Sequence, residues 1–367
     1  MLNPEPIFAT NYQDILKRID QIDPKKYAGT RNFIDGAVTY LSPYISRGVI
    51  STKQVYDAVI AKGFEPNQIE KFIQELAWRD YWQQIWIAKG NAINEDLIKP
   101  QPNAERKGIA ASLNQAETGI DAIDQGVKTL YQTGYMHNHI RMYVASIACN
   151  MAKSHWQLPA KWMYYHLFDG DWASNALSWQ WVCGANSHKL YYANQENINK
   201  YCHTTQSDTF LDIPYERFNN LPIPSALEQT ERLNLSTPLP QTDAPKITKD
   251  KPTLIYNFYN LDPQWHKDID ANRILLLEPS VFQQYPVSEK VLNFCIELAK
   301  VNLPNIQIYV AEFKALEQLA GEIIYKEHPL NNYNGKQEPR TWLTSVTGYF
   351  PSFFAFYKKA RKELIPK

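Results

Sequence analysis

Hydrophobic positions in the first half of the chain recur every three to four residues, the period of one helix face. One such stripe crosses residues 67–89 at Ile69, Phe72, Ile73, Leu76 and Ile85. Asn67 can cap the start of this helix, and Gly90 can end it. Similar spacing predicts a second helix from about Met136 and a third over residues 174–182. We therefore expect residues 10–202 to be mostly helical.

From residue 203 the pattern changes twice. Residues 203–250 contain six prolines among Ser, Thr and Asn, which is typical of a linker or an extended crossing segment. Beyond residue 251, apolar runs at 253–259, 274–277, 307–310 and 323–325 predict strands, and residues 287–301 have helical spacing. No Gly-rich phosphate loop accompanies them. Residues 341–364 combine aromatic and basic side chains, and we expect them to pack the rings and expose the charges.

The predicted fold class is therefore α+β. An all-α helical domain over residues 1–202 is followed by a Pro-rich linker over 203–250. A small α/β region over 251–367 ends with the aromatic and basic helix.

Charge and cysteine content narrow the range of functions. Lys and Arg number 38, as do Asp and Glu, so a nucleic-acid surface has to be a local patch. The four cysteines form no C-x-x-C pair, which predicts reduced thiols and no metal site. The first residues lack the layout of a signal peptide, and no apolar run reaches transmembrane length. These patterns predict a cytoplasmic protein without membrane contact.

Two motifs early in the chain combine polar groups with helix signals. Thr39-Tyr-Leu41-Ser42-Pro, with Tyr27 upstream, can offer hydroxyl and N–H groups to a phosphate at a helix start, or it is an ordinary helix entry. Glu75-Leu-Ala-Trp78-Arg79 places a carboxylate, an indole and a guanidinium on one side of a helix. This second motif can bind a polar aromatic ligand or form a solvated Glu–Arg pair.

Two further motifs follow. Met136-His-Asn138-His-Ile-Arg141-Met142 is a polar cluster that opens an apolar helix, either as a site or as a capped helix end. In the run from Asp169 to Trp181, the side chains of Asp171, Asn175 and Trp179 are four residues apart and share one helix face. Acceptors, an amide and an oxidisable ring suit a planar redox cofactor with polar edges. The alternative is a core helix with a polar end.

Together the four motifs resemble the FAD-binding helical domain of the photolyase/cryptochrome family in residue identity, order and approximate spacing. The resemblance covers residues 10–202 and implies a bound, U-shaped FAD. The residues that match FAD-contact positions are Tyr27, Thr39, Leu41, Ser42, Phe72, Arg79, Asn138, Arg141, Asp169, Asp171 and Asn175.

The resemblance also implies how these residues would divide the FAD among them. Tyr27, Thr39, Leu41, Ser42 and Arg79 would hold the phosphates. On the flavin side, Asp169 paired with Arg141 would flank the isoalloxazine. Asp171 would accept a hydrogen bond from its pyrimidine edge, and Asn175 would lie at the reactive ring nitrogen.

A substrate pocket is implied in the same way. Its matching residues are Glu75, Trp78, Asn138, Met142 and Trp181. The two tryptophans can sandwich a flipped-out pyrimidine dimer, and Glu75 can hydrogen-bond its polar edge. Six-four photolyases have histidine at the position of Met142, so the resemblance implies the cyclobutane lesion.

The implied activity is that of a deoxyribodipyrimidine photolyase, a carbon–carbon lyase. Excited reduced FAD passes one electron to the dimer, the cyclobutane ring splits, and the electron returns. The catalytic set is then Glu75, Asn175, Trp179 and Trp156, with the two tryptophans as first and second stations of the chain that re-reduces the flavin. Leu113 stands where many relatives have the third tryptophan, so photoreduction uses another exit, such as a tyrosine, or is inefficient.

Three questions stay open at the level of sequence. The family's usual N-terminal α/β antenna domain is not expected here, and the α/β stretch after residue 251 is a candidate for a relocated version of it. Residues 186–192 match the family poorly, so single-stranded as well as double-stranded DNA is a candidate substrate. The competing functions are a cryptochrome-like photoreceptor that binds FAD without repair and a flavoprotein or scaffold that does not respond to light.

Overall fold

The computed structural model describes residues 8–365, and these form two compact units. The first, which we call the helical unit, comprises Lys26–Val38 and Lys89–Leu235. The second, which we call the mixed unit, comprises Phe8–Lys25, Thr39–Ala88 and the residues from Ser236 onward. The predicted boundary at residue 202 marks a change in secondary structure along the chain. It is not the boundary of the two units, because the mixed unit contains residues from before and after it.

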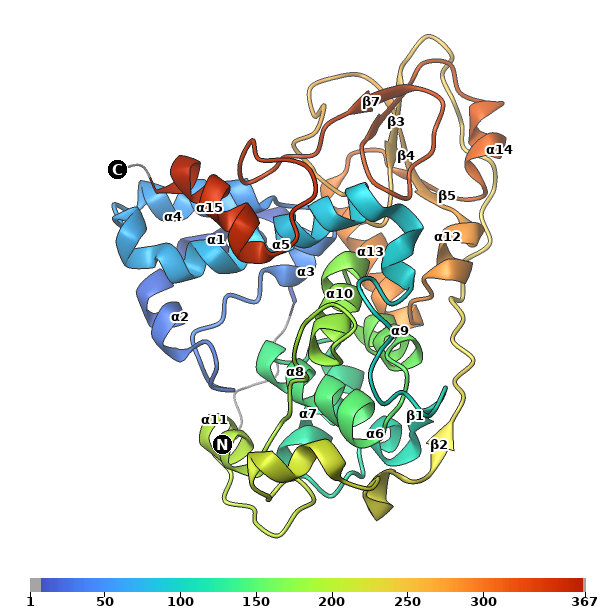
Figure 1. Ribbon diagram of the computed structural model, residues 1–367. Helices are drawn as coiled ribbons and strands as arrows, with labels where there is room; N and C mark the ends of the chain where they lie inside the picture. The colour runs from blue at the N-terminus through green and yellow to red at the C-terminus, as the bar shows by residue number, and fades with distance from the viewer. Residues whose placement is uncertain (1–7, 366–367) are drawn as a thin grey trace. The chain divides into compact units, whose positions relative to one another are not determined.

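The helical unit is built around α8 and α10, which pack against each other; α7 also packs on α8 and α9 on α10 (Figure 1). Its helices are α6 (Ala111–Gln115), α7 (Asp121–Thr133), α8 (Asn138–Ser146), α9 (Gln157–His166), α10 (Trp172–Val182) and α11 (Gln195–Cys202). A π-helical turn, η3 (Ile147–Met151), extends α8, and short 3-10 turns lie at η2 (Gly90–Asn94), η4 (Tyr215–Asn220) and η5 (Ser225–Leu227). Helix α2 (Pro24–Thr30) crosses the boundary between the units.

Side-chain caps decide where the two central helices begin. The Asp171 carboxylate accepts a hydrogen bond from the Ser174 N–H at 2.7 Å and starts α10. The His137 ring nitrogen Nδ1 accepts from the His139 N–H at 3.2 Å and starts α8. Both predicted helices are confirmed, with their starts shifted by less than one turn.

The mixed unit combines helices from the first part of the chain with a sheet from the last part. Its early helices are α1 (Tyr12–Asp20), α3 (Ser42–Ser46), α4 (Thr52–Ala61), η1 (Pro66–Ile69) and α5 (Glu70–Lys89). Its strands are β3 (Thr253–Tyr256), β4 (Asn272–Leu277), β5 (Gln307–Val310), β6 (Ile323–Lys326) and β7 (Lys336–Glu338). Its later helices are α12 (Pro279–Gln284), α13 (Glu289–Asn302), α14 (Phe313–Glu317) and α15 (Phe353–Leu364).

The five strands form one parallel sheet in the order β5-β4-β3-β6-β7. Four of them fall on the predicted apolar runs, and the predicted helix over 287–301 is α13, so the α+β class is confirmed. The sequence did not indicate β7, because this edge strand consists of Lys, Gln and Glu and has no apolar alternation. Side chains from β3, β4 and β6 form a buried aliphatic and aromatic cluster on one face of the sheet, which includes Ile255, Leu276 and Tyr325.

Residues 203–250 divide between the two units at Leu235. In the helical unit, β2 (Thr230–Glu231) pairs antiparallel with β1 (Ile109–Ala110). In the mixed unit, side-chain oxygens of this segment hold the edge of the α/β region: Thr242 Oγ1 accepts from the Val310 N–H at 2.9 Å. The Pro-rich stretch is thus an extended segment with specific contacts.

The start of α5 differs from the prediction. Asn67 does not cap the helix but lies inside the 3-10 turn η1, and α5 begins at Glu70. Pro66 at the first position of η1 favours this tight turn. The predicted end is confirmed, since Gly90 has a left-handed φ of 52° directly after Lys89.

Buried polar side chains on α5 hold the segment before the last helix. Asp80 accepts hydrogen bonds from the Leu343 N–H at 2.7 Å and from the Thr52 hydroxyl at 3.0 Å. Gln84 accepts from the Gly348 N–H at 2.9 Å, and Gln83 accepts from Arg340. A buried polar group is costly without a partner, so these pairings fix where residues 340–348 run.

Helix α15 lies against α5 and α4 (Figure 1), with Arg361 paired to Glu70 and the Tyr56 hydroxyl donating to the Leu364 carbonyl. As predicted, it buries Phe353, Phe356 and Tyr357 and exposes its basic residues. Phe354 is the exception, because 69% of its surface is exposed.

No helix within residues 8–365 is long and apolar enough to cross a membrane. All four cysteines are buried thiols. Over the same range, no group of three or more His, Cys, Asp or Glu side chains is placed to hold a metal ion.

Gly134 ends α7 in the left-handed region and also supports the loop before α10. Its φ is 71°, and a Cβ there would lie 2.4 Å from the Phe168 ring. We predict that Gly134→Ala lowers the free energy of unfolding by about 1–3 kcal/mol more than Gly119→Ala does. Chemical denaturation of both variants measures this difference.

Gly119 is the matched control because its φ is 78° and a Cβ there meets no atom within 4 Å. Both variants therefore carry the backbone strain, and only Gly134→Ala adds the clash with Phe168. Equal losses in the two variants would show that the Phe168 contact yields without cost.

Candidate functional site

The centre of the candidate site is an ion pair in the helical unit. Arg141 on α8 donates through Nη2 to Asp169 Oδ2 at 2.9 Å and through Nε to the Met136 carbonyl at 2.7 Å. Asp169 lies in a tight turn before α10, which the Phe168 N–H ties to the Gly134 carbonyl at 2.8 Å. The pair joins α8 to this turn and confirms that these two predicted residues meet.

Asp169 keeps one oxygen without a partner. Oδ1 is buried and accepts no hydrogen bond from any residue in the described part of the chain. A buried carboxylate oxygen is costly in this state, so the position suits a ligand that offers an N–H or O–H donor. The edge of a flavin's pyrimidine ring carries such a donor, so this oxygen fits the predicted cofactor.

Asn175 on α10 is held by one half of its amide. Its Nδ2 donates to the Ala160 carbonyl of α9 at 2.8 Å, which fixes the orientation of the group. The side-chain oxygen Oδ1 is then the end that can accept a hydrogen bond from a ligand. Asp171, one turn earlier, has the capping role described above, which the sequence interpretation had overlooked.

The predicted electron-transfer residues are buried in the helical unit. Trp179 and Trp156 are both enclosed, and the Trp156 indole N–H donates to the Asp96 carboxylate at 2.8 Å. A carboxylate at this position stabilises positive charge on the indole and can take its proton. Leu113 is fully buried, so no ring stands at the third predicted position.

Three predicted substrate residues also belong to the helical unit. Asn138 is exposed in the first turn of α8, and Met142 is half-buried one turn later on the same face. Trp181 is 41% exposed and lies beside Tyr191, with ring centroids 6.1 Å apart. Tyr27, predicted to contact the cofactor, is half-buried in α2.

The remaining predicted residues belong to the mixed unit. Thr39 Oγ1 accepts from the Leu41 N–H at 3.4 Å, Leu41 is buried, and Ser42 is exposed as the first residue of α3. On α5, Phe72 is buried and packs in the core of the mixed unit.

Glu75, Trp78 and Arg79 have partners of their own on α5. Glu75 pairs with Lys71 one turn earlier at 3.3 Å. The Trp78 ring stacks on Phe353 of α15, with centroids 3.7 Å apart and planes 9° from parallel. Arg79 is half-buried on the wall of a cavity of the same unit. One face of the Trp78 indole is therefore covered by the chain itself.

The helical unit thus brings together Arg141, Asp169, Asp171 and Asn175, the residues predicted for the flavin side. Sequence reasoning missed two groups that position them. His137 stands directly before the apolar helix and could have been found as an N-cap from that place. The Ala160 carbonyl could not, because its contact with Asn175 is tertiary.

Comparison with known proteins identifies the family of this part of the chain. Residues 72–211 match the family model of the FAD-binding domain of DNA photolyase. The deoxyribodipyrimidine photo-lyase of Alkalihalophilus pseudofirmus is 27% identical over 50% of this chain and 40% of its own. That of Agrobacterium fabrum is 28% identical over 51% of this chain and 43% of its own. Cryptochrome-1 of Arabidopsis thaliana is 27% identical over 43% of this chain and 25% of its own.

Among solved structures, the cryptochrome of Synechocystis is similar with a TM-score of 0.50 and 25% identity, over 54% of this chain and 44% of that one. The helical part is thus a flavin-binding domain in class. Within the chain, residues 72–211 match the FAD-binding domain of DNA photolyase, and FAD is the cofactor of that matched domain, as the sequence predicted. The chain spans less than half the length of these relatives.

The cap of α8 should make stability depend on pH. Burial, and then the positive charges of His139 and Arg141, lower the pKa of His137 to about 4. Below about pH 6.5 the His137 ring is protonated in the unfolded chain but stays neutral in the folded chain. The free energy of unfolding therefore decreases as the pH falls. We predict that between pH 7 and pH 4 this residue accounts for a loss of about 3 kcal/mol in unfolding free energy.

His137→Asn tests this, because Asn caps a helix and does not titrate. The variant should lose about 3 kcal/mol less than the wild type over that pH range in chemical denaturation. His188→Asn, at an exposed position of the same unit, should follow the wild-type curve. Identical pH profiles for wild type and His137→Asn would contradict the assignment.

Proposed function

We propose that this protein is a light-driven flavoprotein that splits cyclobutane pyrimidine dimers in DNA. The observation that carries the proposal is the flavin-side set: the fixed Arg141–Asp169 pair with a buried, unpartnered Asp169 Oδ1. The Asn175 amide anchored to Ala160 completes that set. A buried carboxylate oxygen without a partner is costly, so this oxygen favours a bound hydrogen-bond donor.

In this proposal Asp169 Oδ1 would accept a hydrogen bond from the flavin's pyrimidine edge, the role expected for Asp171, because Asp171 caps α10. Asn175 Oδ1 would accept at the reactive ring nitrogen. The guanidinium of Arg141 offsets negative charge on the reduced ring system. Bound FAD supplies the light absorption and the single electron. The protein's contribution is to hold and orient the ring and to set its charge.

Residues with exposed faces would receive the lesion. Trp181 offers a large exposed ring on which a base can stack, and Asn138 and Met142 offer an amide and a thioether on one face of α8. On α5, the Glu75 carboxylate would accept hydrogen bonds from the dimer's N–H groups. Its pairing with Lys71 is partly exposed and is therefore weak enough to exchange for a ligand.

One observation favours the second candidate, a cryptochrome-like photoreceptor without repair activity. The Phe353 ring covers one face of the Trp78 indole. A pyrimidine ring cannot stack on that face while Phe353 is in place. A dimer can then stack only on the other face, or it has to displace Phe353. A photoreceptor has no need for that face to be open.

The test is repair of a thymine cyclobutane dimer in single- and double-stranded oligonucleotides by the reduced full chain, under blue light and in the dark. We predict light-dependent repair, and the strand preference identifies the substrate form. Glu75→Gln should lower the repair yield per bound flavin about threefold to tenfold, the value of one hydrogen bond to a charged group.

Glu70→Gln is the matched control, because Glu70 is a paired glutamate on the same helix whose partner is Arg361. It should leave the repair yield unchanged. If a flavin-loaded wild type repairs neither oligonucleotide, repair is excluded and the photoreceptor becomes the better description. If Phe353→Ala then gains repair, the covered face of Trp78 is the reason.

A further inference from the structure

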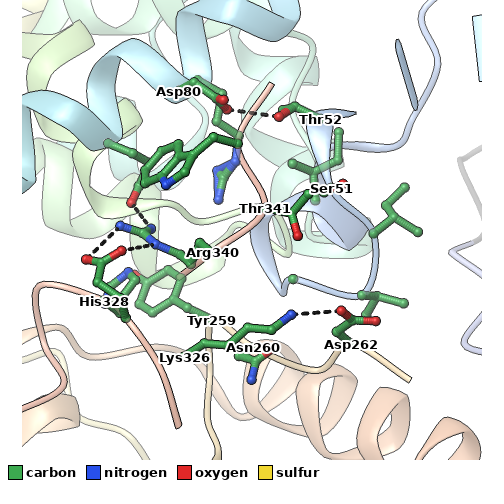
Figure 2. A pocket seen from close by; sticks show the side chains of 18 of the residues that line it. Ser51, Thr52, Asp80, Tyr259, Asn260, Asp262, Lys326, His328, Arg340 and Thr341 are labelled. Atoms are coloured by element: carbon green, nitrogen blue, oxygen red, sulfur yellow. Dashed lines mark hydrogen bonds and ion pairs between the residues drawn. The ribbon is translucent and has the colours of Figure 1, made fainter. Parts of the chain in front are cut away.

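A cavity lies in the mixed unit at the carboxyl ends of the parallel strands (Figure 2). Its volume is about 110 Å³. Asn260 follows β3, His328 follows β6 and Arg340 follows β7, and all three line it. Strand β3 is the first strand of this sheet in chain order. The chain runs from β3 to β4 and β5 on one side, and β6 and β7 lie on the other side, so the strand order reverses between β3 and β6. In open parallel sheets this switch point is where ligands bind.

Two buried hydrogen-bond donors on the cavity wall have no acceptor. His328 is 5% exposed, and its Nδ1 accepts from the Leu330 N–H at 3.3 Å, which places the proton of the neutral ring on Nε2. Within residues 8–365 that Nε2 has no partner, and neither has Nδ2 of Asn260, which is 6% exposed. The ring of His328 is held flat against Tyr259, with centroids 4.4 Å apart. These donors are fixed in place and unsatisfied.

The charged groups around the cavity are ordered by pairing. Lys326 pairs with Asp262 at 2.8 Å, and Arg340 pairs with Glu327 at 2.9 Å (Figure 2). The third carboxylate, Asp80, accepts two hydrogen bonds from the protein, and burial raises its pKa. None of these carboxylates accepts a hydrogen bond from His328 Nε2 or Asn260 Nδ2.

Three arginines act on His328 from the surrounding elements. Burial, together with the charges of Arg340, Arg79 and Arg47, holds the pKa of His328 well below its usual range. The same arginines that oppose a proton on this ring favour a negative charge beside it. The missing acceptor is therefore better supplied by an anion than by a neutral group.

We propose that this cavity binds a small oxygen-rich anion, a carboxylate or a phosphoryl group, whose oxygens accept from His328 Nε2 and Asn260 Nδ2. The volume corresponds to several water-sized positions, enough for the anionic end of a ligand. None of the flavin-side residues lines this cavity, and the proposal does not depend on the proposed repair activity. Arg79 is the one residue that it shares with the predicted phosphate contacts of FAD.

The test is the thermal midpoint of the full chain, measured without added FAD and again with saturating FAD, as inorganic phosphate or succinate is titrated in. Sodium chloride at matched ionic strength is the reference. A saturable rise with either anion supports the proposal, and the anion that gives it distinguishes phosphoryl from carboxylate. No rise beyond that in chloride overturns it. A rise that is present without FAD and disappears at saturating FAD also overturns the proposal, because the anion would then bind where the flavin phosphates bind.

Two variants remove the donors one at a time. His328→Phe keeps a flat ring on Tyr259, and Asn260→Ala deletes the amide; each should weaken the anion's Kd about tenfold. His266→Phe is the control, a histidine of the same unit that lies outside the cavity lining. If His328→Phe fails to fold, Asn260→Ala still decides. An unchanged Kd in whichever of the two folds overturns the proposal.

Discussion

The rule that a buried polar group needs a partner organises this structure more than any other constraint. Where the chain meets the rule from its own residues, it builds scaffold: Asp171 caps α10, and Asp80 and Gln84 hold the segment after β7. Among the buried groups that the chain leaves unpaired, two sets lie where another molecule can complete them. Asp169 Oδ1 in the helical unit is one, and the two donors of the switch-point cavity are the other.

The two kinds of unpaired group call for opposite ligand chemistry. A carboxylate oxygen beside Arg141 asks for a hydrogen-bond donor, which the pyrimidine edge of a flavin provides. The imidazole and amide N–H groups of the cavity ask for an acceptor. One chain can therefore present two sites that do not compete for the same functional group.

Helix α5 links the fold of the mixed unit to its candidate chemistry. Its buried face holds the segment 340–348 through Asp80, Gln83 and Gln84, and this segment leads into α15. Helix α15 in turn brings Phe353 onto Trp78. The same tether that stabilises the end of the chain thus decides how much of that indole a substrate can reach.

Local pattern was sufficient for much of this. The apolar stripes predicted α5, α8 and α10, and four apolar runs predicted strands, because burial on one face leaves a period in the sequence. The motifs around Asp169 and Arg141 predicted the FAD-binding family, which the family model supports. Strand β7 was not predicted, because a polar edge strand has no alternation of apolar and polar residues.

Tertiary partners were beyond the reach of pattern. Asp80 directly follows the Glu75–Arg79 motif and had no predicted role, because no local pattern indicates its hydrogen bond with the Leu343 N–H. Phe353 and Trp78 stack although they are far apart in the chain. The sequence pattern therefore predicted a substrate contact for the Trp78 indole and could not predict its packing partner. The orphan donors His328 and Asn260 follow different strands, and only the sheet brings them to one cavity.

The most direct test of the central claim is the FAD dissociation constant of the purified full chain, measured by flavin fluorescence for wild type and Asp169→Asn. The variant puts an amide donor where Oδ1 accepts, so we predict a folded protein that binds FAD about 10- to 100-fold more weakly. Asp121→Asn, at an exposed position of the helical unit, should bind as the wild type does. A folded Asp169→Asn protein with wild-type affinity would contradict the account.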